Sequence, residues 1–400
     1  MADERGACMS YPRTNKVFTS GELHDLRRTV AIRSATRRNL AADPLYATAL
    51  PQEVSMQLTY RCNLRCHHCF QWNEQGFFHN YDSQRRRSEL DLDIVRDVLE
   101  TTAPEQSKVF LWGGEPLMHT RFGEIAKLLG AVPRVVNMCT NGLLMERNAE
   151  HLLTIGPRLN LLVSLDGFEP EHEALRGKGS FRRTMRNVEA MLDLQRRGEY
   201  QGELSVACMV SEDMVGRMYE FTEWAEQTGF NSVYWLLPWY ISPDTASAMD
   251  RLYEESFSWL NPPEPGDKPT WHSYTYALPE QHLPVLKESM ARLASRVWDL
   301  RVRYQPQVEE DEIDDFIRGT SRPAQRRSRC LAVSNRIEIH ADGRVSSCKF
   351  FPEFVIGDLG EQSMQDIWQS ERFTRVRGIL RDSGLMPVCS KCILLYLSGE

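Results

Sequence analysis

Strand-like and helix-like segments alternate along this chain from about residue 52 to residue 240. The strand-like segments are 54–58, 109–112, 135–139, 161–165, 204–210 and 232–237. Strands joined by helices pair in parallel, because a right-handed crossover returns each strand to the same edge of the sheet. The sequence therefore predicts an α/β fold with a partial (β/α)6 TIM-like barrel, whose chemistry gathers at the carboxyl ends of the strands.

The alternation stops after Trp239, and a different pattern follows. Proline and aromatic residues come first, and a helical pattern then covers residues 283–302. A second group of cysteines lies near the end of the chain. We therefore predict four parts: an N-terminal extension (1–50), the barrel (51–245), a connecting helical and aromatic segment (246–324), and a small α+β domain (325–400).

Composition excludes several classes of partner. The net charge of −7 argues against a nucleic-acid binder, whose phosphate contacts need clustered lysine and arginine. No apolar run reaches membrane-spanning length, and the first residues lack the core of a signal peptide. We therefore expect a cytoplasmic protein that binds no membrane. In that compartment the ten cysteines are expected as metal ligands or reduced thiols.

Three cysteines follow the first barrel strand at CxxxCxxC spacing: Cys62, Cys66 and Cys69. A cubane iron–sulfur cluster normally takes four thiolates, so three leave one iron open to another ligand. A zinc site and a disulfide loop are the alternatives. Zinc sites favour CxxC pairs and four ligands, and a disulfide does not suit the compartment. The loop is therefore interpreted as a 4Fe–4S site.

This spacing, with the aromatic Phe70 after the third cysteine, resembles the signature of the radical S-adenosylmethionine (SAM) superfamily. In that family the open iron binds the amino and carboxylate groups of SAM. An electron from the cluster cleaves SAM to a 5′-deoxyadenosyl radical, which abstracts a hydrogen atom from the substrate. The resemblance implies SAM as cofactor and a flavodoxin or ferredoxin as electron donor.

A second motif follows the second strand and resembles the GGEP motif of the same family. It consists of Gly113, Gly114, Glu115 and Pro116. The resemblance implies that its backbone and glutamate hold the amino group of SAM. By the same resemblance, Ser164 at the end of the fourth strand contacts the ribose or carboxylate of SAM.

Two charged residues follow Ser164, and their roles are less defined. A guanidinium binds carboxylates with two hydrogen bonds, so Arg176 is a candidate partner for the SAM carboxylate. The alternative is an exposed arginine at a helix entry. For Asp166, a helix cap is the preferred interpretation and a substrate contact the alternative.

The C-terminal cysteines are Cys330, Cys348, Cys389 and Cys392. The first two flank a predicted β-hairpin with an Asp-Gly turn, and the last two form a CxxC pair. The pattern resembles the Twitch and SPASM domains of radical SAM enzymes. Because the full SPASM pattern has further cysteines and two clusters, the resemblance implies one auxiliary 4Fe–4S cluster of Twitch type. A structural zinc is the alternative, since four cysteines with a CxxC also suit zinc.

Two further cysteines, Cys139 and Cys208, fall within strand-like segments and are expected to be buried small hydrophobic residues. For Cys139 the alternative is a hydrogen or proton donor to the substrate radical. Cys8 lies in the N-terminal extension and receives no role.

These motifs predict a radical SAM oxidoreductase in natural-product biosynthesis, whose auxiliary cluster accepts an electron from the substrate radical. A small molecule such as a sugar, aminocyclitol or nucleoside is the expected substrate, because residues 1–50 are too short for a peptide-binding domain. The alternative is post-translational modification of a ribosomal peptide precursor. An iron–sulfur electron carrier or sensor is a third hypothesis, and the GGEP motif argues against it because a carrier needs no SAM pocket.

Overall fold

The computed structural model describes residues 11–260, 268–320 and 327–399, and a ten-stranded sheet runs through it. The strand order is β12-β11-β10-β2-β3-β4-β5-β6-β7-β9. From β10 to β9 every neighbouring pair is parallel. The six predicted strands are β2 (Glu53–Gln57), β3 (Lys108–Trp112), β4 (Val136–Thr140), β5 (Leu159–Ser164), β6 (Leu204–Met209) and β7 (Ser232–Leu236). The predicted α/β partial barrel is confirmed.

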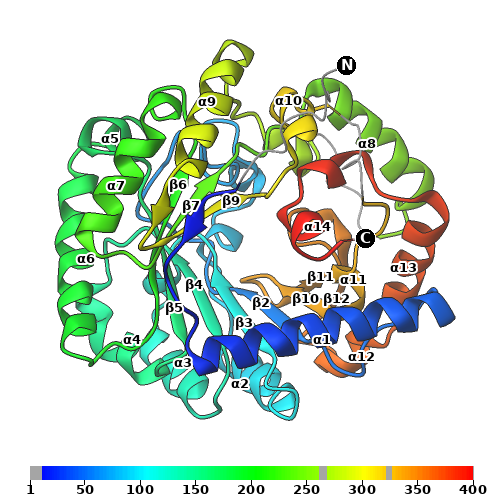
Figure 1. Ribbon diagram of the computed structural model, residues 1–400. Coiled ribbons are helices and arrows are strands. Elements are labelled where there is room, and N and C mark those ends of the chain that lie inside the picture. Colours follow the sequence, from blue (N-terminus) through cyan, green and yellow to red (C-terminus); the bar gives the residue numbers. More distant parts are fainter. Residues whose placement is uncertain (1–10, 261–267, 321–326, 400) are drawn as a thin grey trace.

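Crossover helices cover the outer face of the strands (Figure 1). They are α2 (Leu92–Thr101), α3 (Phe122–Gly130), α4 (Ala149–Ile155), α5 (Glu169–Arg176), α6 (Ser180–Arg196) and α7 (Met218–Thr228). Alternate strand residues such as Val54 and Met56 are fully buried in the core. Their neighbours, such as Glu53, line a cavity inside the barrel. Successive side chains of a strand point to opposite faces of the sheet. One set therefore packs in the hydrophobic core beneath the helices, and the other faces the barrel interior.

Two strands widen the sheet at both sides: β9, which the sequence analysis did not predict, and β10, a strand of the predicted hairpin whose pairing with the barrel was not predicted. β9 (Arg301–Gln305) pairs with β7, and β10 (Arg336–Ile339) pairs with β2. The helical pattern predicted over 283–302 is right for α9 (Leu283–Ala294) and wrong beyond it. There the chain forms β8 (Val297–Trp298), which pairs with β1 (Arg13–Thr14), and then β9. Pairing with distant strands decides the conformation of this short segment.

The C-terminal region shares its sheet with the barrel. The predicted hairpin is present as β10 and β11 (Arg344–Ser346), and its turn glycine, Gly343, has φ +83°. Glu338 on β10 accepts a hydrogen bond from Ser55 on β2 (2.8 Å). The rest of the region contains β12 (Val355–Asp358), α11 (Ala332–Asn335), α12 (Met364–Trp368), α13 (Glu371–Ser383) and α14 (Ile393–Ser398). The segments that carry the two cysteine groups are therefore attached to one sheet.

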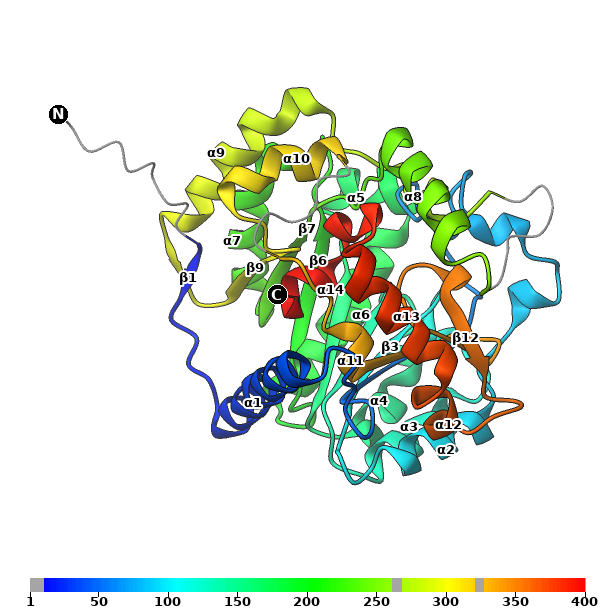
Figure 2. The same cartoon turned by 90° about the vertical axis from the view of Figure 1, so that its right-hand side faces the viewer.

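The N-terminal segment contains a 23-residue helix, α1 (Ser20–Ala42), that crosses the amino ends of the barrel strands (Figures 1 and 2). A capping box between Thr19 and Glu22 begins it. Asp25 of α1 forms an ion pair with Arg158, next to the start of β5. The remaining α-helices in the described part of the chain are α8 (Pro243–Ser256) and α10 (Ile313–Arg318). None of the helices in the described ranges is long and apolar enough to cross a membrane.

Because β10 belongs to the barrel sheet, a cavity in this strand should destabilise the whole protein. Ile339 is fully buried, so Ile339→Ala should lower the free energy of unfolding by about 2–5 kcal/mol. Urea unfolding followed by circular dichroism and by tryptophan fluorescence should give one shared transition. Val285→Ala, at an exposed position, is the control. Two separate unfolding transitions, of which Ile339→Ala shifts only one, would show that the C-terminal region and the barrel unfold independently.

Candidate active site and auxiliary metal centre

The CxxxCxxC loop follows β2 and brings its three thiols together at the carboxyl edge of the barrel. Burial is the main cause that raises the pKa of Cys62 to about 12, and the carboxylate of Glu115 and the other two thiols contribute to this rise. Burial also raises the pKa of Cys66 to about 11. Without metal these thiols are protonated, so iron has to displace their protons on binding. The three sulfur donors fit the cluster that the sequence predicts.

Aromatic packing holds the loop in place. Trp72 donates its indole N–H to the carbonyl of Tyr60 (2.9 Å), just before the first cysteine. Phe70, the residue after the third cysteine, stacks on Tyr274 with 4.4 Å between ring centroids. Phe78 packs against both Tyr60 and Trp72. The aromatic residue of the signature thus fixes the loop against the segment that follows α8.

The Gly-Gly motif is locked to the same loop by backbone hydrogen bonds. The N–H of Gly114 donates to the carbonyl of Thr59, and the N–H of Glu115 donates to that of Arg61 (both 2.8 Å). A Cβ atom on Gly114 would collide with the carbonyl oxygen of Arg61, and one on Gly113 with that of Thr59. These glycines therefore allow two backbone segments to approach closely, immediately before Cys62.

Glu115 is almost completely buried at 1% exposure. Its carboxylate accepts hydrogen bonds from the Thr140 hydroxyl (2.8 Å) and from the backbone N–H groups of Asn141 (2.7 Å) and Leu117 (3.2 Å). Burial raises its pKa to about 7, although these donors oppose the rise. Because a carboxylate offers about four acceptor sites, one remains for the ammonium group of a ligand.

The structure buries Arg176 beside the cysteine loop, so the exposed alternative is wrong. Its Nε donates to Asp166 (2.6 Å), and its Nη1 lies 3.6 Å from the sulfur of Cys66. Burial raises the pKa of Asp166, but Arg176 and His68 outweigh it and hold the pKa at about 2. The helix-cap prediction for Asp166 is also wrong, because α5 begins after Phe168. The only sequence signal for this ion pair was two opposite charges ten residues apart.

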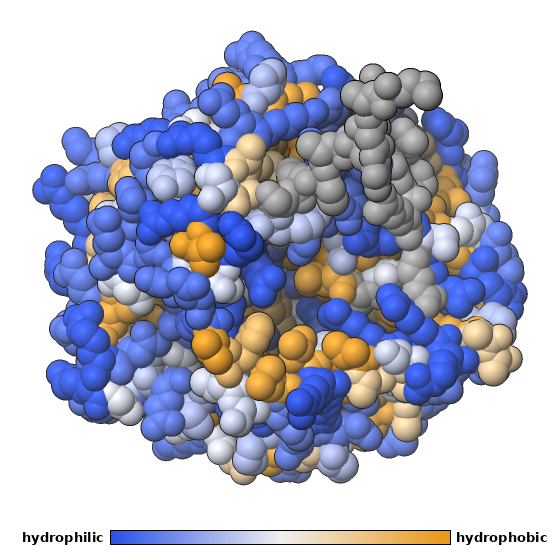
Figure 3. All heavy atoms as spheres, viewed as in Figure 1, coloured by the Kyte–Doolittle hydropathy of each residue, from blue (hydrophilic) through white to orange (hydrophobic). Residues whose placement is uncertain are grey.

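Ser164, at the end of β5, lines a cavity of about 400 Å³ inside the barrel. Figure 3 shows a hollow in the middle of the face that α1 crosses. Cys139 lines the same cavity, which corrects the prediction that it is a buried core residue. Cys208 is fully buried in the core, as predicted. Cys139 points inward because it alternates with Met138, which faces the helices. Cys8 lies outside the described residues.

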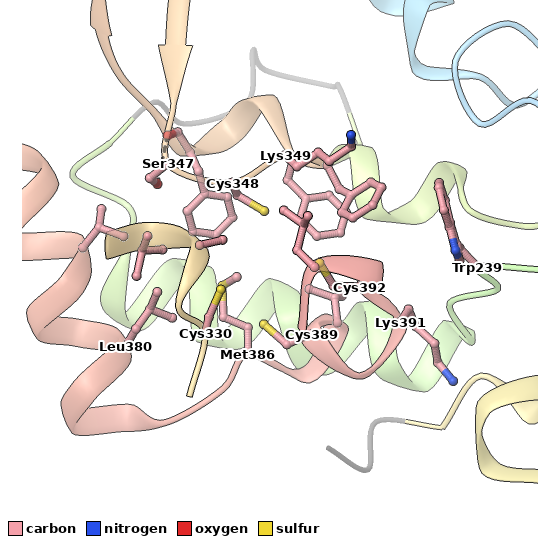
Figure 4. A pocket seen from close by; sticks show the side chains of 18 of the residues that line it. Trp239, Cys330, Ser347, Cys348, Lys349, Leu380, Met386, Cys389, Lys391 and Cys392 are labelled. Carbon is pink, nitrogen blue, oxygen red and sulfur yellow. Dashed lines mark hydrogen bonds between the residues drawn. The ribbon is translucent and has the colours of Figure 1, made fainter. Parts of the chain in front are cut away.

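The four C-terminal cysteines line one small cavity of about 50 Å³ with mostly apolar walls (Figure 4). Cys330 precedes α11, and Cys348 follows β11. Cys389 lies in a short 3-10 helix (Pro387–Lys391), and Cys392 is the N-cap of α14. Burial raises the pKa of Cys392 to about 12, and Cys330 adds to the rise. In the described part of the chain, no His, Cys, Asp or Glu side chains form a ready-made single-ion site. Four sulfur donors around an apolar cavity therefore fit a fully ligated cluster better than a single zinc ion.

Aromatic residues that the sequence analysis did not assign separate the two cysteine groups. Trp239 packs on Phe350 at 4.9 Å and on Phe70 at 6.2 Å. The hydroxyl of Tyr274 donates to the carbonyl of Phe350 (3.0 Å). Lys349 lies over the ring of Phe110, with its Nζ 3.8 Å from the ring centroid. The only sequence signal for Lys349 and Phe350 was their position directly after Cys348.

Comparison with known families agrees with this geometry. The radical SAM superfamily matches residues 56–221, and SPASM, an iron–sulfur cluster-binding domain, matches residues 330–393. The chain belongs to the radical SAM superfamily. It is a radical SAM enzyme with a C-terminal SPASM domain, as predicted. SAM and iron–sulfur clusters follow from the two matches. The number of auxiliary clusters stays a prediction.

Several proteins resemble this radical SAM enzyme over part or most of its length. The AdoMet-dependent heme synthase of Methanosarcina barkeri is 24% identical over 348 residues, which cover 86% of this chain and 89% of the relative. The mycofactocin maturase MftC of Mycolicibacterium smegmatis is 29% identical over 180 residues (44% and 42%). The subtilosin biosynthesis protein AlbA of Bacillus subtilis, named for an antilisterial bacteriocin, is 23% identical over 340 residues (84% and 63%).

Among solved structures, Streptococcus suis SuiB bound to its precursor peptide SuiA superposes with a TM-score of 0.56. The identity is 13%, and the match covers 92% of this chain and 74% of SuiB. At this identity the likeness shows a common fold.

Substitution of Glu115 should separate its structural role from ligand binding. Glu115→Gln should weaken SAM binding by about 1.5–3 kcal/mol, because a hydrogen bond to a charged group is lost. Isothermal titration of anaerobically reconstituted protein measures the affinity. Thr140→Val is the matched control, since it removes one hydrogen bond to Glu115 and keeps the carboxylate. Equal loss of affinity in both variants would mark Glu115 as a structural residue only.

Iron content tests the two cysteine groups. We expect about eight irons per chain after anaerobic reconstitution, because each cubane holds four. The combined Cys62→Ala, Cys66→Ala and Cys69→Ala variant should keep about half of this iron, in the auxiliary site. Elemental analysis measures iron and zinc together, and Cys208→Ala should change neither. One zinc and no iron in the triple variant would make the C-terminal site structural.

Proposed function

We propose that this radical SAM enzyme modifies a peptide bound inside its barrel. The main support for this proposal is the barrel cavity, which extends along the full length of the strands. Glu53 and Lys108, the first residues of β2 and β3, line it, and so do Ser164 and Leu236, the last residues of β5 and β7. A five-residue strand rises about 16 Å, so the cavity suits an extended segment of similar length. A sugar or nucleoside would occupy only one end.

The carboxyl end of this cavity is the proposed SAM site. Cys62, Cys66 and Cys69 would hold the cluster, and when bound the cluster and SAM supply a 5′-deoxyadenosyl radical. The remaining acceptor site of Glu115 would take the SAM ammonium group, next to the backbone of residues 113–116. Ser164 would contact the ribose or carboxylate of SAM.

Arg176 would act at the same site in two ways. Asp166 accepts from its Nε and leaves the terminal nitrogens directed toward Cys66 and His68. The guanidinium is therefore oriented to bind a SAM carboxylate. It also places a positive charge beside a cluster thiolate, which stabilises the ionised sulfur.

Cys330, Cys348, Cys389 and Cys392 would hold one auxiliary 4Fe–4S cluster, which supplies an electron acceptor. Zinc has no accessible redox state and could not serve this purpose. A flavodoxin or ferredoxin would supply the electron for SAM cleavage. The net reaction would be the removal of two electrons and two protons from the peptide.

The relatives support a peptide substrate better than the sugar, aminocyclitol or nucleoside expected first. Two of them are named for a maturase and for bacteriocin biosynthesis, and the fold is shared with a protein solved with a precursor peptide. The short N-terminal segment, which favoured a small molecule, forms a long helix beside the cavity mouth. The likeness to a heme synthase is the reason to include small molecules in the test.

Co-expression tests the proposal directly. The enzyme is expressed with each short peptide encoded beside its gene, and the purified peptides are compared by mass spectrometry. We expect one peptide to lose two hydrogen atoms with the wild-type enzyme and none with the Cys62→Ala variant. In parallel, reconstituted enzyme is incubated with SAM, reductant and small-molecule extract. A new product from the extract alone, with every peptide unchanged, would overturn the peptide assignment.

A further inference from the structure

Helix α1 presents one face to the barrel and the opposite face to solvent. Asp25, Arg28, Thr29, Ile32 and Arg33 line the barrel cavity. The only two acidic residues of the helix, Glu22 and Asp25, form ion pairs with Arg301 and Arg158. Both negative charges of α1 are therefore paired with arginines of the barrel.

The outer face of α1 combines exposed apolar side chains with positive charge. Leu23, Leu26 and Val30 are 38%, 47% and 54% exposed. Arg27 and Arg38 are also exposed. At 100° per residue these five positions fall within about 120° of the helix circumference. Figure 3 shows apolar side chains gathered over α1, beside the central hollow. This face is positive although the chain as a whole carries a net charge of −7.

The cavity behind the helix carries the same excess of positive charge. Its lysine and arginine side chains are Arg28, Arg33, Lys108, Arg158, Arg336 and Lys349. Its acidic side chains are Asp25, Glu53 and Glu203. Positive charge therefore predominates both on the outer face of α1 and inside the barrel. The resulting electrostatic potential favours a negatively charged peptide.

We propose that the outer face of α1 binds an acidic segment of the peptide substrate that also carries apolar side chains. The segment to be modified then passes the helix into the barrel cavity. Leu23, Leu26 and Val30 follow the i, i+3, i+7 spacing by which a helix offers anchors to a partner. Docking beside the cavity mouth raises the effective concentration of the reacting segment. This inference rests on the proposed peptide function and adds how the peptide is recognised.

An acidic electron donor is the other partner that such a face could attract. Its position argues against that role. α1 crosses the amino ends of the strands, whereas the CxxxCxxC loop follows the carboxyl end of β2. The length of a five-residue strand, about 16 Å, therefore separates α1 from the CxxxCxxC loop. A donor on α1 would therefore dock at the wrong end of the barrel for the SAM cluster.

A pair of labelled probe peptides tests the docking surface. One is a fluorescein-labelled peptide of Glu, Leu and Ala, and the other has every Glu replaced by Lys. Fluorescence anisotropy with the full-length protein should show at least about tenfold tighter binding of the acidic probe, and salt should reduce the difference. Equal affinity for the two probes would overturn the proposal.

Charge reversal locates the binding face. Arg27→Glu with Arg38→Glu should weaken acidic-probe binding by about tenfold or more. Arg183→Glu with Arg186→Glu, on the exposed side of α6, makes the same charge change and should leave binding unchanged. Equal loss in both double variants would show that net charge alone attracts the probe. Thermal unfolding of each variant checks that it is folded.

A benzophenone group on the acidic probe gives a test that needs no variant. Its cross-links to wild-type protein should map to α1, and a map confined to other elements would overturn the proposal. If the α1 variant binds the probe normally but is reduced more slowly by flavodoxin, the face serves an electron donor instead. Peptide modification is tested separately by the mass of the product. If α1 does not bind the probe, the conclusion on peptide modification is therefore unaffected.

Discussion

Strand β2 is the element on which both cofactor sites depend. It pairs in parallel with β3 on one side and with β10 on the other. Its carboxyl end continues into Thr59 and Arg61, which accept the hydrogen bonds of the Gly-Gly-Glu backbone, and then into Cys62. Parallel pairing brings the ends of neighbouring strands to one edge. The cysteine loop, the GGEP motif and the auxiliary hairpin are therefore all positioned by one strand.

Burial of charge shapes the chemistry at that edge. The thiols and Glu115 lie where burial opposes ionisation, and each is brought toward its ionised form only by a specific partner. Arg176 supplies such a partner for Cys66, and Asp166 holds the guanidinium in place. Removal of one member of a buried ion pair costs about 3–5 kcal/mol, because the other charge is left unpaired. The site is therefore stable only as a complete set of groups.

The barrel keeps an interior cavity because alternate side chains of its strands face in opposite directions. One set of side chains, such as Met56 and Met138, forms the core beneath the helices. The other set, such as Ser164 and Cys139, lines the cavity between the carboxyl ends of the strands and α1. The same fold thus keeps a packed outer layer and an open inner cavity.

The sequence by itself determined the features that depend on neighbouring residues. Six barrel strands, the Asp-Gly hairpin and the two cysteine groups were readable because periodicity, turn residues and ligand spacing are local properties. The tertiary structure decided where β9 and β10 pair, why Arg176 is buried beside Cys66 and His68, and where α1 lies. Each of these depends on residues brought together from distant parts of the chain. Such contacts leave no periodic pattern in a single sequence, so only the folded structure reveals them.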